Sequence, residues 1–425
     1  MDLYNEFEWR GLVYDATDGL KERFAQPDIT AYVGFDPTAS SLHVGNLLPI
    51  MALARLERAG HSPIAVVGGG TGLIGDPSGK AMERQLLTAE QVNANAQDIR
   101  SQLARLLDLD SKNTRSKLVD NLEWLGGLRA VDLMRDTGKH FTVNYMLSKE
   151  SIKRRVESKD GISYTEFSYL LLQAYDFLQL YSRHGCNVQM GGSDQWGNIT
   201  AGIELIRRST SAGSLRAYGL VLPLVMTAAG TKFGKTEEGT IWLDPKMTRP
   251  YDFYQFWLNT DDRDAVKYLK FFTFLRRERI DELDAATVRE PERRLAQREL
   301  AREATSLVHG AAAVREAESA ARVLFSGDIS GLSVDQLLRI FPSVPSSTMP
   351  SVATGWPITE LLVSSGVTPS KSEATRLIRN GGIYMNGLRV TDEKLRLRPD
   401  DAVEGQLFVV RKGKRDNFLI RITKT

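Results

Sequence analysis

The sequence has very little cysteine, and this excludes two kinds of structure. Cys186 is the single cysteine among 425 residues, so an intrachain disulfide is impossible and a zinc site built from cysteines is excluded. Long apolar runs are also missing, so no segment predicts a membrane span. Residues 1–6 lack the basic and then apolar layout of a signal peptide. We therefore expect a cytoplasmic protein with no membrane partner.

The chain as a whole has no large excess of positive or negative charge, although its charges are unevenly distributed. The formal net charge is +2. From residue 356 to the end, 13 Lys and Arg stand against 8 Asp and Glu, a net charge of +5, so the rest carries about −3. The length and the 42% hydrophobic content predict two or three globular domains. The basic C-terminal region is the part to examine for a nucleic acid partner.

Residues 30–225 alternate short apolar segments with longer helical patterns. This order predicts an α/β fold, a Rossmann-like doubly wound parallel sheet with helices on both faces. We expect strands at residues 30–35, 64–67, 187–190 and 219–224, and helices at residues 47–59, 89–107 and 166–181. Glycines follow several of these strands, at Gly34, 68–70 and 191–192. Ligands of such sheets bind at this carboxyl edge.

The chain changes character after residue 250. Charged helical patterns, such as 281–288 and 291–307, replace the strands and predict a helical region. Residues 326–355 contain three prolines and predict an irregular connection. Beyond them, a capping box at Ser370 opens a helix that glycines 381–382 end, and an Asn386-Gly387 turn joins two short strands. The last part of the chain therefore predicts a small α+β domain.

Two short signatures far apart in the sequence predict one ATP site. Residues 43–46 read His-Val-Gly-Asn and follow the first strand, so their polar groups and helix N-terminus face the ligand edge of the sheet. Residues 232–236 read Lys-Phe-Gly-Lys-Thr and lie between Gly230 and Gly239, which predicts a mobile loop with two cations. The simpler alternatives are a structural histidine at a helix start and solvated loop lysines.

Residues 70–75 match the glycine pattern of dinucleotide-binding proteins and follow a strand. A true site continues into a helix and reaches an acidic residue after a second strand, about twenty residues later. Here Asp76-Pro77 follows at once, and Glu90 lies in a helical pattern. Residues 78–80 also fail to complete a phosphate-binding loop. The sequence therefore disfavours a nicotinamide-dependent oxidoreductase.

Taken in order, the motifs resemble those of class I aminoacyl-tRNA synthetases. Residues 43–46 resemble the HIGH signature and residues 232–236 the KMSKS signature. Residues 192–198, Gly-Ser-Asp-Gln-Trp-Gly-Asn, are similar to the tyrosyl branch. The likeness to bacterial tyrosyl-tRNA synthetases runs nearly end to end, through residues 34–38, 74–77, 138–141 and 164–169, and the C-terminal unit resembles a small RNA-binding fold shared with a ribosomal small-subunit protein.

The resemblance implies a tyrosine-tRNA ligase that forms tyrosyl-adenylate from L-tyrosine and ATP and then charges tRNA(Tyr). The catalytic residues that it implies are Thr38, His43, Asn46, Lys232, Lys235 and Thr236. Those implied for tyrosine are Tyr32, Asp76, Tyr169, Gln173, Asp176 and Gln195. Those implied for ATP are Gly34, Asp36, His43, Asn46, Gly192, Asp194, Lys232 and Lys235.

The spacing of three of these residues agrees with a single small polar ligand. Tyr169, Gln173 and Asp176 are four and three positions apart, so they share one helix face. Tyr32 and Asp176 are expected to read the substrate phenol, one through a hydroxyl and one as an acceptor. Phenylalanine would then be rejected, because its ring would leave both groups buried without a partner.

Two positions depart from the tyrosyl pattern. Asn46 stands where most tyrosyl enzymes have a second histidine, and Val33 stands where many have cysteine. Asparagine can donate a hydrogen bond to the nucleotide but cannot carry charge. Asparagine at this position also occurs in the tryptophanyl branch, which remains an alternative. A non-catalytic RNA-binding relative of the synthetases is a second alternative.

The resemblance also implies partners and an organisation. It predicts ATP accompanied by Mg²⁺, no permanently bound cofactor, no metal site, and a homodimer paired through residues 126–145. The expected parts are a catalytic domain at 1–225 with an insertion near 125–165, a loop and helical domain at 226–325, a connection at 326–355, and an RNA-binding domain at 356–425. The basic side chains expected to contact tRNA are Lys149, Lys153, Arg154, Arg155, Arg207, Arg208, Arg411, Lys412, Lys414 and Arg415.

Overall fold

The computed structural model describes residues 2–78, 86–107, 109, 115–159, 161–211, 215–236, 239–326, 329–341, 344–413 and 416–423. The chain divides into two compact units, Met1–Ala313 and Val314–Thr425. The predicted region 1–225 and most of the predicted region 226–325, up to residue 313, thus belong to the same unit. Within the described residues, no helix is both long and apolar enough to cross a lipid bilayer.

The first unit is built on a parallel sheet with one antiparallel edge strand. Its order is β1-β6-β5-β2-β3-β4, and β1 is antiparallel to β6. The strands are β1 (Asp15–Ala16), β2 (Thr30–Phe35), β3 (Ser62–Val67), β4 (Lys117–Asp120), β5 (Val188–Gly192) and β6 (Tyr218–Leu222). Tyr32 pairs with Ile64 on one side and with Gln189 on the other. The four predicted strands are confirmed with small shifts at their ends, whereas β1 and β4 were not predicted.

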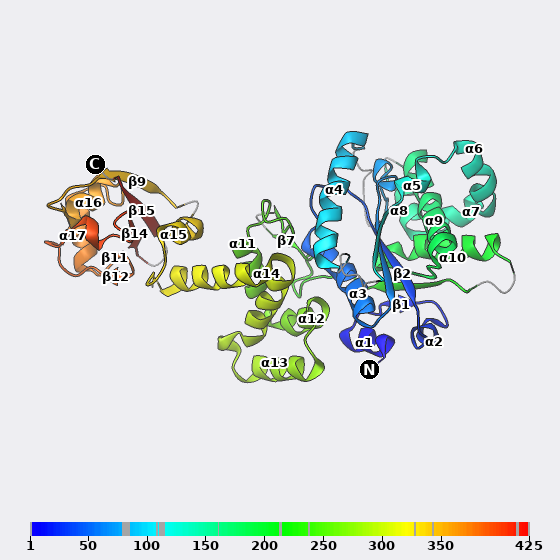
Figure 1. Cartoon of the computed structure of the whole chain (residues 1–425), viewed down its shortest axis with the longest axis horizontal. Coiled ribbons are helices and arrows are strands. Elements are labelled where there is room, and N and C mark those ends of the chain that lie inside the picture. The colour runs from blue at the N-terminus through cyan, green and yellow to red at the C-terminus, as the bar shows by residue number, and fades with distance from the viewer. Residues whose placement is uncertain are drawn as a thin grey trace. The chain divides into compact units, whose positions relative to one another are not determined.

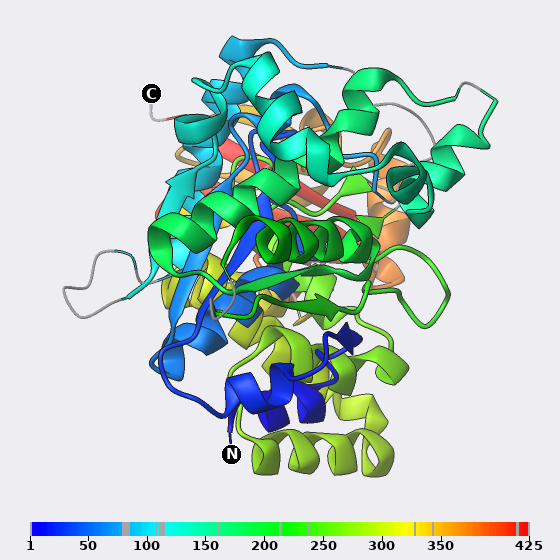
Figure 2. The same cartoon turned by 90° about the vertical axis from the view of Figure 1, so that its right-hand side faces the viewer.

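Helices cover both faces of this sheet, as the sequence predicts (Figure 1). On one face lie α3 (Leu47–Arg58) and α4 (Ala89–Leu106), and on the other lie α9 (Tyr164–His184) and α10 (Trp196–Ser209), which are in front of the strands in Figure 2. Covering both faces explains why β3 is almost wholly apolar and buried. Ser163 caps the start of α9, and Gly185 ends it with a φ of 63°.

Shorter elements connect this framework. Near the N-terminus are α1 (Leu3–Arg10) and α2 (Leu20–Phe24), and single turns at the carboxyl edge are η1 (Val44–Asn46), η2 (Thr71–Leu73) and η5 (Ser193–Gln195). The predicted insertion is a run of short helices between β4 and α9: α5 (Leu122–Leu125), α6 (Ala130–Asp132), η3 (Leu133–Thr137), η4 (Gly138–His140), α7 (Val143–Leu147) and α8 (Glu150–Val156).

The helical region after β6 packs around an aromatic cluster. It contains β7 (Lys235–Thr236), β8 (Gly239–Thr240), α11 (Pro250–Leu258), α12 (Asp262–Phe272), α13 (Arg277–Arg289), η6 (Pro291–Arg293) and α14 (Leu295–Ser326). Phe233 stacks on Phe272 with ring centroids 5.2 Å apart, and it also meets Trp257 and Tyr268. Helix α14 is broken at Gly310, which has a φ of 85°. The aromatic contacts join the second signature to this helical region.

The second unit is an α+β domain with a sheet of order β12-β11-β14-β15-β9. Its elements are α15 (Val334–Ile340), β9 (Ser346–Pro350), β10 (Trp356–Pro357), α16 (Ile358–Ser364), α17 (Lys371–Arg379), β11 (Ile383–Met385), β12 (Leu388–Arg389), β13 (Arg396–Leu397), η7 (Pro399–Asp401), β14 (Leu407–Lys412) and β15 (Asp416–Thr423). Asn386 and Gly387 have φ values of 48° and 83°, as the predicted turn between β11 and β12 requires.

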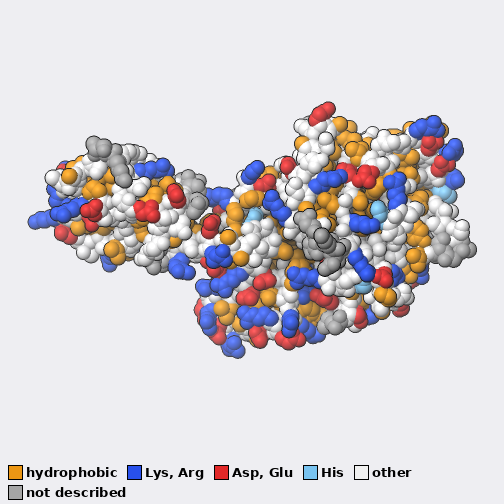
Figure 3. Space-filling model, viewed as in Figure 1, with side chains coloured by type: hydrophobic (Ala, Val, Ile, Leu, Met, Phe, Trp, Pro, Cys, Tyr) orange, Lys and Arg blue, Asp and Glu red, His pale blue; other side chains and the backbone are white. Residues whose placement is uncertain are grey.

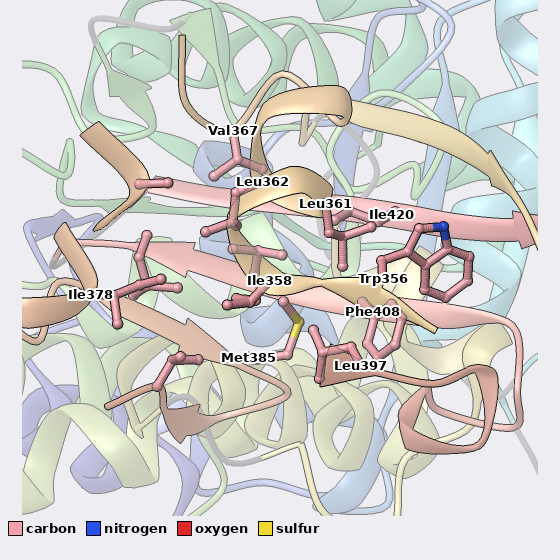
Figure 4. Close-up of a cluster of buried hydrophobic side chains, with 14 of the residues drawn as sticks. Trp356, Ile358, Leu361, Leu362, Val367, Ile378, Met385, Leu397, Phe408 and Ile420 are labelled. Carbon is pink, nitrogen blue, oxygen red and sulfur yellow. The ribbon is translucent and has the colours of Figure 1, made fainter. Parts of the chain in front are cut away.

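Alternation along β14 places apolar side chains on both faces of this sheet. Phe408 and Val410 belong to a core with Trp356 and the helices α16 and α17 (Figure 4). Leu407 and Val409 face the opposite way and pack with residues of α15. The prediction of an irregular connection at 326–355 is therefore wrong in part. It contains α15, and β9 pairs in parallel with β15, because sheet pairing overrides the low strand propensity of its Ser and Pro residues.

Candidate active site

The predicted residues of the first unit gather at the carboxyl edge of the sheet, where the strand order reverses. Strand β2 has β3 on one side and β5 on the other, so the crevice between the ends of β2 and β5 is the switch point of the sheet. Gly34 lies near the end of β2 and Gly192 at the end of β5. A side chain at Gly192 would come within 2.6 Å of the Asp194 carboxylate. Glycine there leaves room for the Asp194 side chain.

The inner end of the candidate site is the buried pair Tyr32, on β2, and Asp176, on α9, which are 2% and 4% exposed. The Asp176 carboxylate accepts hydrogen bonds from Asn121 Nδ2 at 2.8 Å and Trp124 Nε1 at 2.7 Å. Burial raises the pKa of Asp176 to about 7, and the two hydrogen bonds oppose that rise. The Tyr32 hydroxyl is buried and has no hydrogen-bond partner among the described residues. Burial and the nearby Asp176 raise its pKa well above the usual value.

Three consecutive glycines make room for the polar groups beside this pair. A side chain at Gly68 would come within 2.1 Å of Asp36 Oδ1, and one at Gly69 within 2.3 Å of Asp120 Oδ1. The backbone N–H groups of Gly69 and Gly70 instead donate to Asp120 and Asn121, at 3.1 and 2.8 Å. The glycine run 68–70, whose last glycine also begins the dinucleotide-like pattern at 70–75, therefore orients the side chains of Asp120 and Asn121 at the end of β4.

Asp36 is held on two sides by protein hydroxyls. Tyr169 OH donates to Asp36 Oδ2 at 2.8 Å, and Thr71 Oγ1 donates to Oδ1 at 2.7 Å. Burial, followed by the charge of Asp36, raises the pKa of Tyr169 well above its usual value. Asn121 Nδ2 also donates to Thr71 Oγ1 at 2.9 Å. Hydrogen bonds thus connect the predicted nucleotide residue Asp36 to the residues around Asp176.

A second polar network joins α9, η5 and the segment after η2. Gln195 Nε2 donates to Asp76 Oδ2 at 2.7 Å, and Gln173 Nε2 donates to Gln195 Oε1 at 3.2 Å. Asn198 Nδ2 contacts Gln173 Oε1 at 2.8 Å and Gln195 Oε1 at 3.2 Å. The structure therefore brings the predicted residues Asp76, Gln173 and Gln195 together, although they come from three separate segments.

The first signature forms a compact cap at the start of α3. His43 Nδ1 accepts from Gly45 N at 3.0 Å, and Asn46 Oδ1 accepts from His43 N at 3.0 Å. Asn46 thus uses its amide oxygen to hold the turn. Its amide nitrogen remains chemically able to donate. Thr38 is exposed at the same edge of the sheet, and its N–H donates to the Asp36 carbonyl at 2.9 Å.

The second signature lies directly against the first. Val44 N donates to Ile241 O at 3.0 Å, and a side chain at Gly234 would come within 2.5 Å of Val44 Cγ2. Gly234 has a φ of 79°, so only glycine meets both the backbone and the space requirement without strain. Lys232 and Lys235 are exposed, and Thr236 pairs with Gly239 in β7 and β8. The two signatures therefore lie against each other, and that they form one ATP site stays a prediction.

Four polar residues of these networks were not predicted: Thr71, Asn121, Trp124 and Asn198. Asn121 and Trp124 follow β4, a strand too short and too polar to show alternation in the sequence. The signal that could have found them is an Asp-Asn pair at positions 120–121 after an apolar pair at 118–119. Polar residues at the end of a parallel strand reach the ligand edge of a sheet.

The predicted tRNA contacts are more scattered. Arg155 is 2% exposed and forms two hydrogen bonds to Glu166, at 2.8 and 3.0 Å, so its prediction as an RNA contact is wrong. Its neighbour Arg154 is exposed and pairs with Glu150, and Lys153 is also exposed. Lys149 donates to Thr200 and lies over the Tyr145 ring, with 4.1 Å between its Nζ and the ring centroid.

Arg207 and Arg208 both pair with Glu204. In the second unit, Arg411 lies over the Tyr384 ring at 4.0 Å from the centroid, and Lys412 pairs with Glu373. Lys414 and Arg415 lie outside the described residues. Lys and Arg are interspersed with Asp and Glu over much of the face shown in Figure 3.

The sheet is doubly wound and has polar residues at its switch point. A histidine that caps a helix and a lysine segment lie beside them. This combination is typical of a nucleotide-binding α/β enzyme. Residues 25–326 match the family model for tRNA synthetases class I (W and Y), and residues 336–420 match that of the tyrosine--tRNA ligase SYY-like C-terminal domain. The chain belongs to the class I tRNA synthetases of the tryptophanyl and tyrosyl type.

Individual relatives agree with this assignment. The chain is 53% identical to a tyrosine--tRNA ligase of Roseiflexus castenholzii, over 99% of each chain. It is 52% identical to one of Bacillus caldotenax, over 99% of this chain and 100% of the other. A solved C-terminally truncated mitochondrial tyrosyl-tRNA synthetase of Aspergillus nidulans is 32% identical with a TM-score of 0.69, and the match covers 76% of this chain and 94% of that one.

Proposed function

We propose that this chain is a tyrosine-tRNA ligase, which activates L-tyrosine with ATP and transfers it to the 3′ end of tRNA(Tyr). The observation that carries the choice of amino acid is the pair of groups at the bottom of the crevice. The Tyr32 hydroxyl is buried with no hydrogen-bond partner in the part of the chain that the structure describes, and Asp176 is fixed by Asn121 and Trp124. A substrate phenol that bonds to both would relieve the cost of the unpartnered hydroxyl, whereas an indole offers no acceptor to Tyr32.

In the first step, an oxygen of the tyrosine carboxylate attacks the α-phosphorus of ATP. The bond from that phosphorus to the β-bridging oxygen breaks, so pyrophosphate leaves and tyrosyl-adenylate remains. No protein nucleophile is needed, so the residues act by alignment and by stabilising charge. We assign the amino group of tyrosine to Asp76, Tyr169 and Gln173, the ribose and reacting carboxylate to Asp194 and Gln195, and the phosphates to Thr38, His43, Asn46, Lys232, Lys235 and Thr236.

The phosphate end also depends on the metal that accompanies ATP. Within the described residues, no group of three or more His, Cys, Asp or Glu side chains is arranged to hold a metal ion. In this proposal Mg²⁺ enters as Mg·ATP, bound mainly by phosphate oxygens and water. In this proposal Gly34, Gly192 and Asp36 line the nucleotide side of the crevice.

In the second step, a terminal ribose hydroxyl of tRNA attacks the carbonyl carbon of the adenylate, and AMP leaves. Without the buried Arg155, the proposed RNA contacts are Lys149, Lys153, Arg154, Arg207, Arg208, Arg411, Lys412, Lys414 and Arg415. Arg411 on the Tyr384 ring combines a cation with an aromatic face, which suits an RNA strand. We place the reaction in the cytoplasm, where ATP and tRNA are available.

We further propose a homodimer that pairs through the insertion. Support comes from apolar side chains that are unusually exposed there: Val131 at 68%, Met134 at 57% and Val143 at 60%. Exposed apolar groups close in sequence are typical of a protein interface. The molar mass in solution, measured by light scattering, tests this proposal.

The central test is ATP-pyrophosphate exchange measured with each amino acid in turn. We expect exchange with tyrosine and not with tryptophan or phenylalanine. Exchange with tryptophan instead would favour the tryptophanyl alternative, for which Asn46 is the supporting residue. No exchange with any amino acid, in a chain that still binds tRNA, would favour a non-catalytic RNA-binding relative.

The role of the second unit is tested by truncation. Because β9 belongs to the C-terminal sheet, a cut at residue 355 would divide that domain, and a cut after Ala313, the end of the first unit, is preferable. We expect the shortened chain to keep tyrosine-dependent exchange and to lose most of its tRNA charging. Charging at the rate of the full chain would contradict the assignment of RNA contacts to the second unit.

A further inference from the structure

Two buried arginines donate to the C-terminal end of α12. Arg55 Nη2 is 2.7 Å from the carbonyl oxygen of Thr273 and 3.2 Å from those of Lys270 and Phe271. Arg10 Nη1 contacts the same carbonyls of Lys270 and Thr273, at 3.0 and 3.2 Å. The last carbonyls of a helix lack partners within the helix, and a cation there also interacts favourably with the helix dipole.

The Arg55 side chain is almost fully removed from water, with 1% of it exposed. Burial lowers its pKa to about 9, so it remains a cation at neutral pH. The Glu6 carboxylate is more distant, with 3.9 Å between its Oε1 and Arg55 Nε. Arg55 is therefore held mainly by the backbone of α12, and this contact fixes one helix against another.

Arg55 and His43 lie at opposite ends of one rigid element. His43 caps η1, which continues directly into α3, and Arg55 lies in the last turn of α3. Nine of the 12 residues of α3 are buried, so the helix cannot tilt without disturbing the core. A shift of α12 relative to Arg55 is therefore a shift relative to His43.

Helix α12 in turn supports the segment that carries Lys232 and Lys235. The rings of its residues Tyr268 and Phe272 lie 4.9 and 5.2 Å from the ring of Phe233. Its residue Asp264 accepts a hydrogen bond from the backbone N–H of Ala228 at 2.6 Å. Contacts with α12 thus hold the lysine segment at two points.

We propose that Arg55 is a positioning residue for the formation of the adenylate. By joining the C-terminal ends of α3 and α12, it sets where the lysine segment stands relative to His43, although it lies outside the crevice itself. The inference rests on the proposed function, because it assigns both signatures to the same ATP. Arg10 joins the same end of α12 to α1, which carries neither signature, and therefore provides a matched control.

The test compares Arg55→Met and Arg10→Met in the full chain. Each variant removes donors from the carbonyls of Lys270 and Thr273, so we expect a similar fall in thermal unfolding temperature. For Arg55→Met we expect a kcat for tyrosine-dependent exchange lower by roughly tenfold to a hundredfold, because small misplacements of reacting groups are costly. Its Kd for tyrosine should stay within about twofold of wild type. Arg10→Met should keep kcat within about twofold.

Equal losses of kcat in the two variants, or an unchanged kcat in a folded Arg55→Met chain, would overturn the inference. If Arg55→Met does not fold, Arg55→Lys keeps a cation at the helix end with fewer donors, and it is then combined with Phe233→Leu. Two changes that act through the same contact give less than the product of their separate rate losses. If the rate loss of the double variant equals the product of the two single losses, Arg55 does not act through the contact with Phe233. If the wild-type chain shows no tyrosine-dependent exchange, it is the proposed function that fails.

Discussion

At the inner end of the crevice, both oxygens of Asp176 accept hydrogen bonds from buried donors, whereas at the outer end Lys232 and Lys235 extend from an exposed segment. The inner groups are fixed before any ligand arrives. The outer charges are exposed to water, and their segment is held through its backbone and through the ring of the neighbouring Phe233. The same site thus combines a rigid polar pocket with cations that are free to adjust.

This difference separates selectivity from rate. A buried polar group penalises a wrong ligand only if it cannot move to find another partner, so the tyrosine end must be rigid. Charge stabilisation is needed only when ATP is present. Until then, exposed lysines remain charged without a desolvation cost, because they keep their hydration. We expect changes at the outer end to alter rate and changes at the inner end to alter the choice of amino acid.

The largest expected effect is at the outer end. Lys235→Ala should lower the rate of adenylate formation by about 10²- to 10³-fold, because it removes a cation directed at the phosphates. The Kd for tyrosine should not change. The measurement is a single-turnover burst of pyrophosphate, with tyrosine binding measured separately by equilibrium dialysis.

Lys246→Ala removes another exposed lysine outside the signature and serves as the control. We expect it to behave like wild type. A normal burst from Lys235→Ala would show that the two ends are not divided as we describe.

The second effect is smaller and lies at the inner end. Tyr32→Phe removes the unpartnered buried hydroxyl and should lower the ratio of kcat/KM for tyrosine over phenylalanine by several-fold to about tenfold, the range of one hydrogen bond. The kcat with saturating tyrosine should change much less. Exchange measured with both amino acids gives the ratio.

Tyr181→Phe is the control, because Tyr181 lies on α9, the helix that carries Asp176, but its hydroxyl already donates to Leu215 O at 2.7 Å. It should leave the ratio unchanged. If Tyr32→Phe lowered kcat and left the ratio intact, Tyr32 would belong with the residues that determine rate.

The contrast between the two ends could be predicted only in part from the sequence. Both signatures are contiguous, and the spacing of Tyr169, Gln173 and Asp176 shows one helix face. The supports of Asp176 come from a different segment, after β4, and no local pattern relates Asn121 to residue 176. Contacts between distant segments depend on the order of strands, which periodicity does not give.

The two wrong predictions have the same physical origin. Arg155 lies in a run of three basic residues, which is typical of a solvated face, but its partner Glu166 is 11 positions away on another helix. The segment that contains β9 is rich in Ser and Pro, and its strand forms only because β15 offers an edge for pairing. In both cases tertiary contacts overrode the local signal.

The last and most specific prediction concerns pH. In the folded chain, burial raises the pKa of Asp176 from 3.8 to about 7. Between about pH 4 and pH 7 the folded state therefore holds a proton that the unfolded state has lost. The protonation of Asp176 therefore stabilises the folded state fully below about pH 4, less as the pH rises through this window, and not above pH 7. The total loss in the free energy of unfolding is on the order of a few kcal/mol.

The side chain in Asp176→Asn cannot titrate. From pH 5 to pH 8 the free energy of unfolding of the wild type should therefore fall relative to that of this variant. Trp124→Phe removes a donor that lowers the pKa of Asp176, so it should move the decline to higher pH. Urea titrations at several pH values measure both effects. Parallel curves for wild type and Asp176→Asn would mean that the carboxylate is already ionised at pH 5 in the folded chain. The inner end would then resemble the outer one, with a charge in place before the ligand binds.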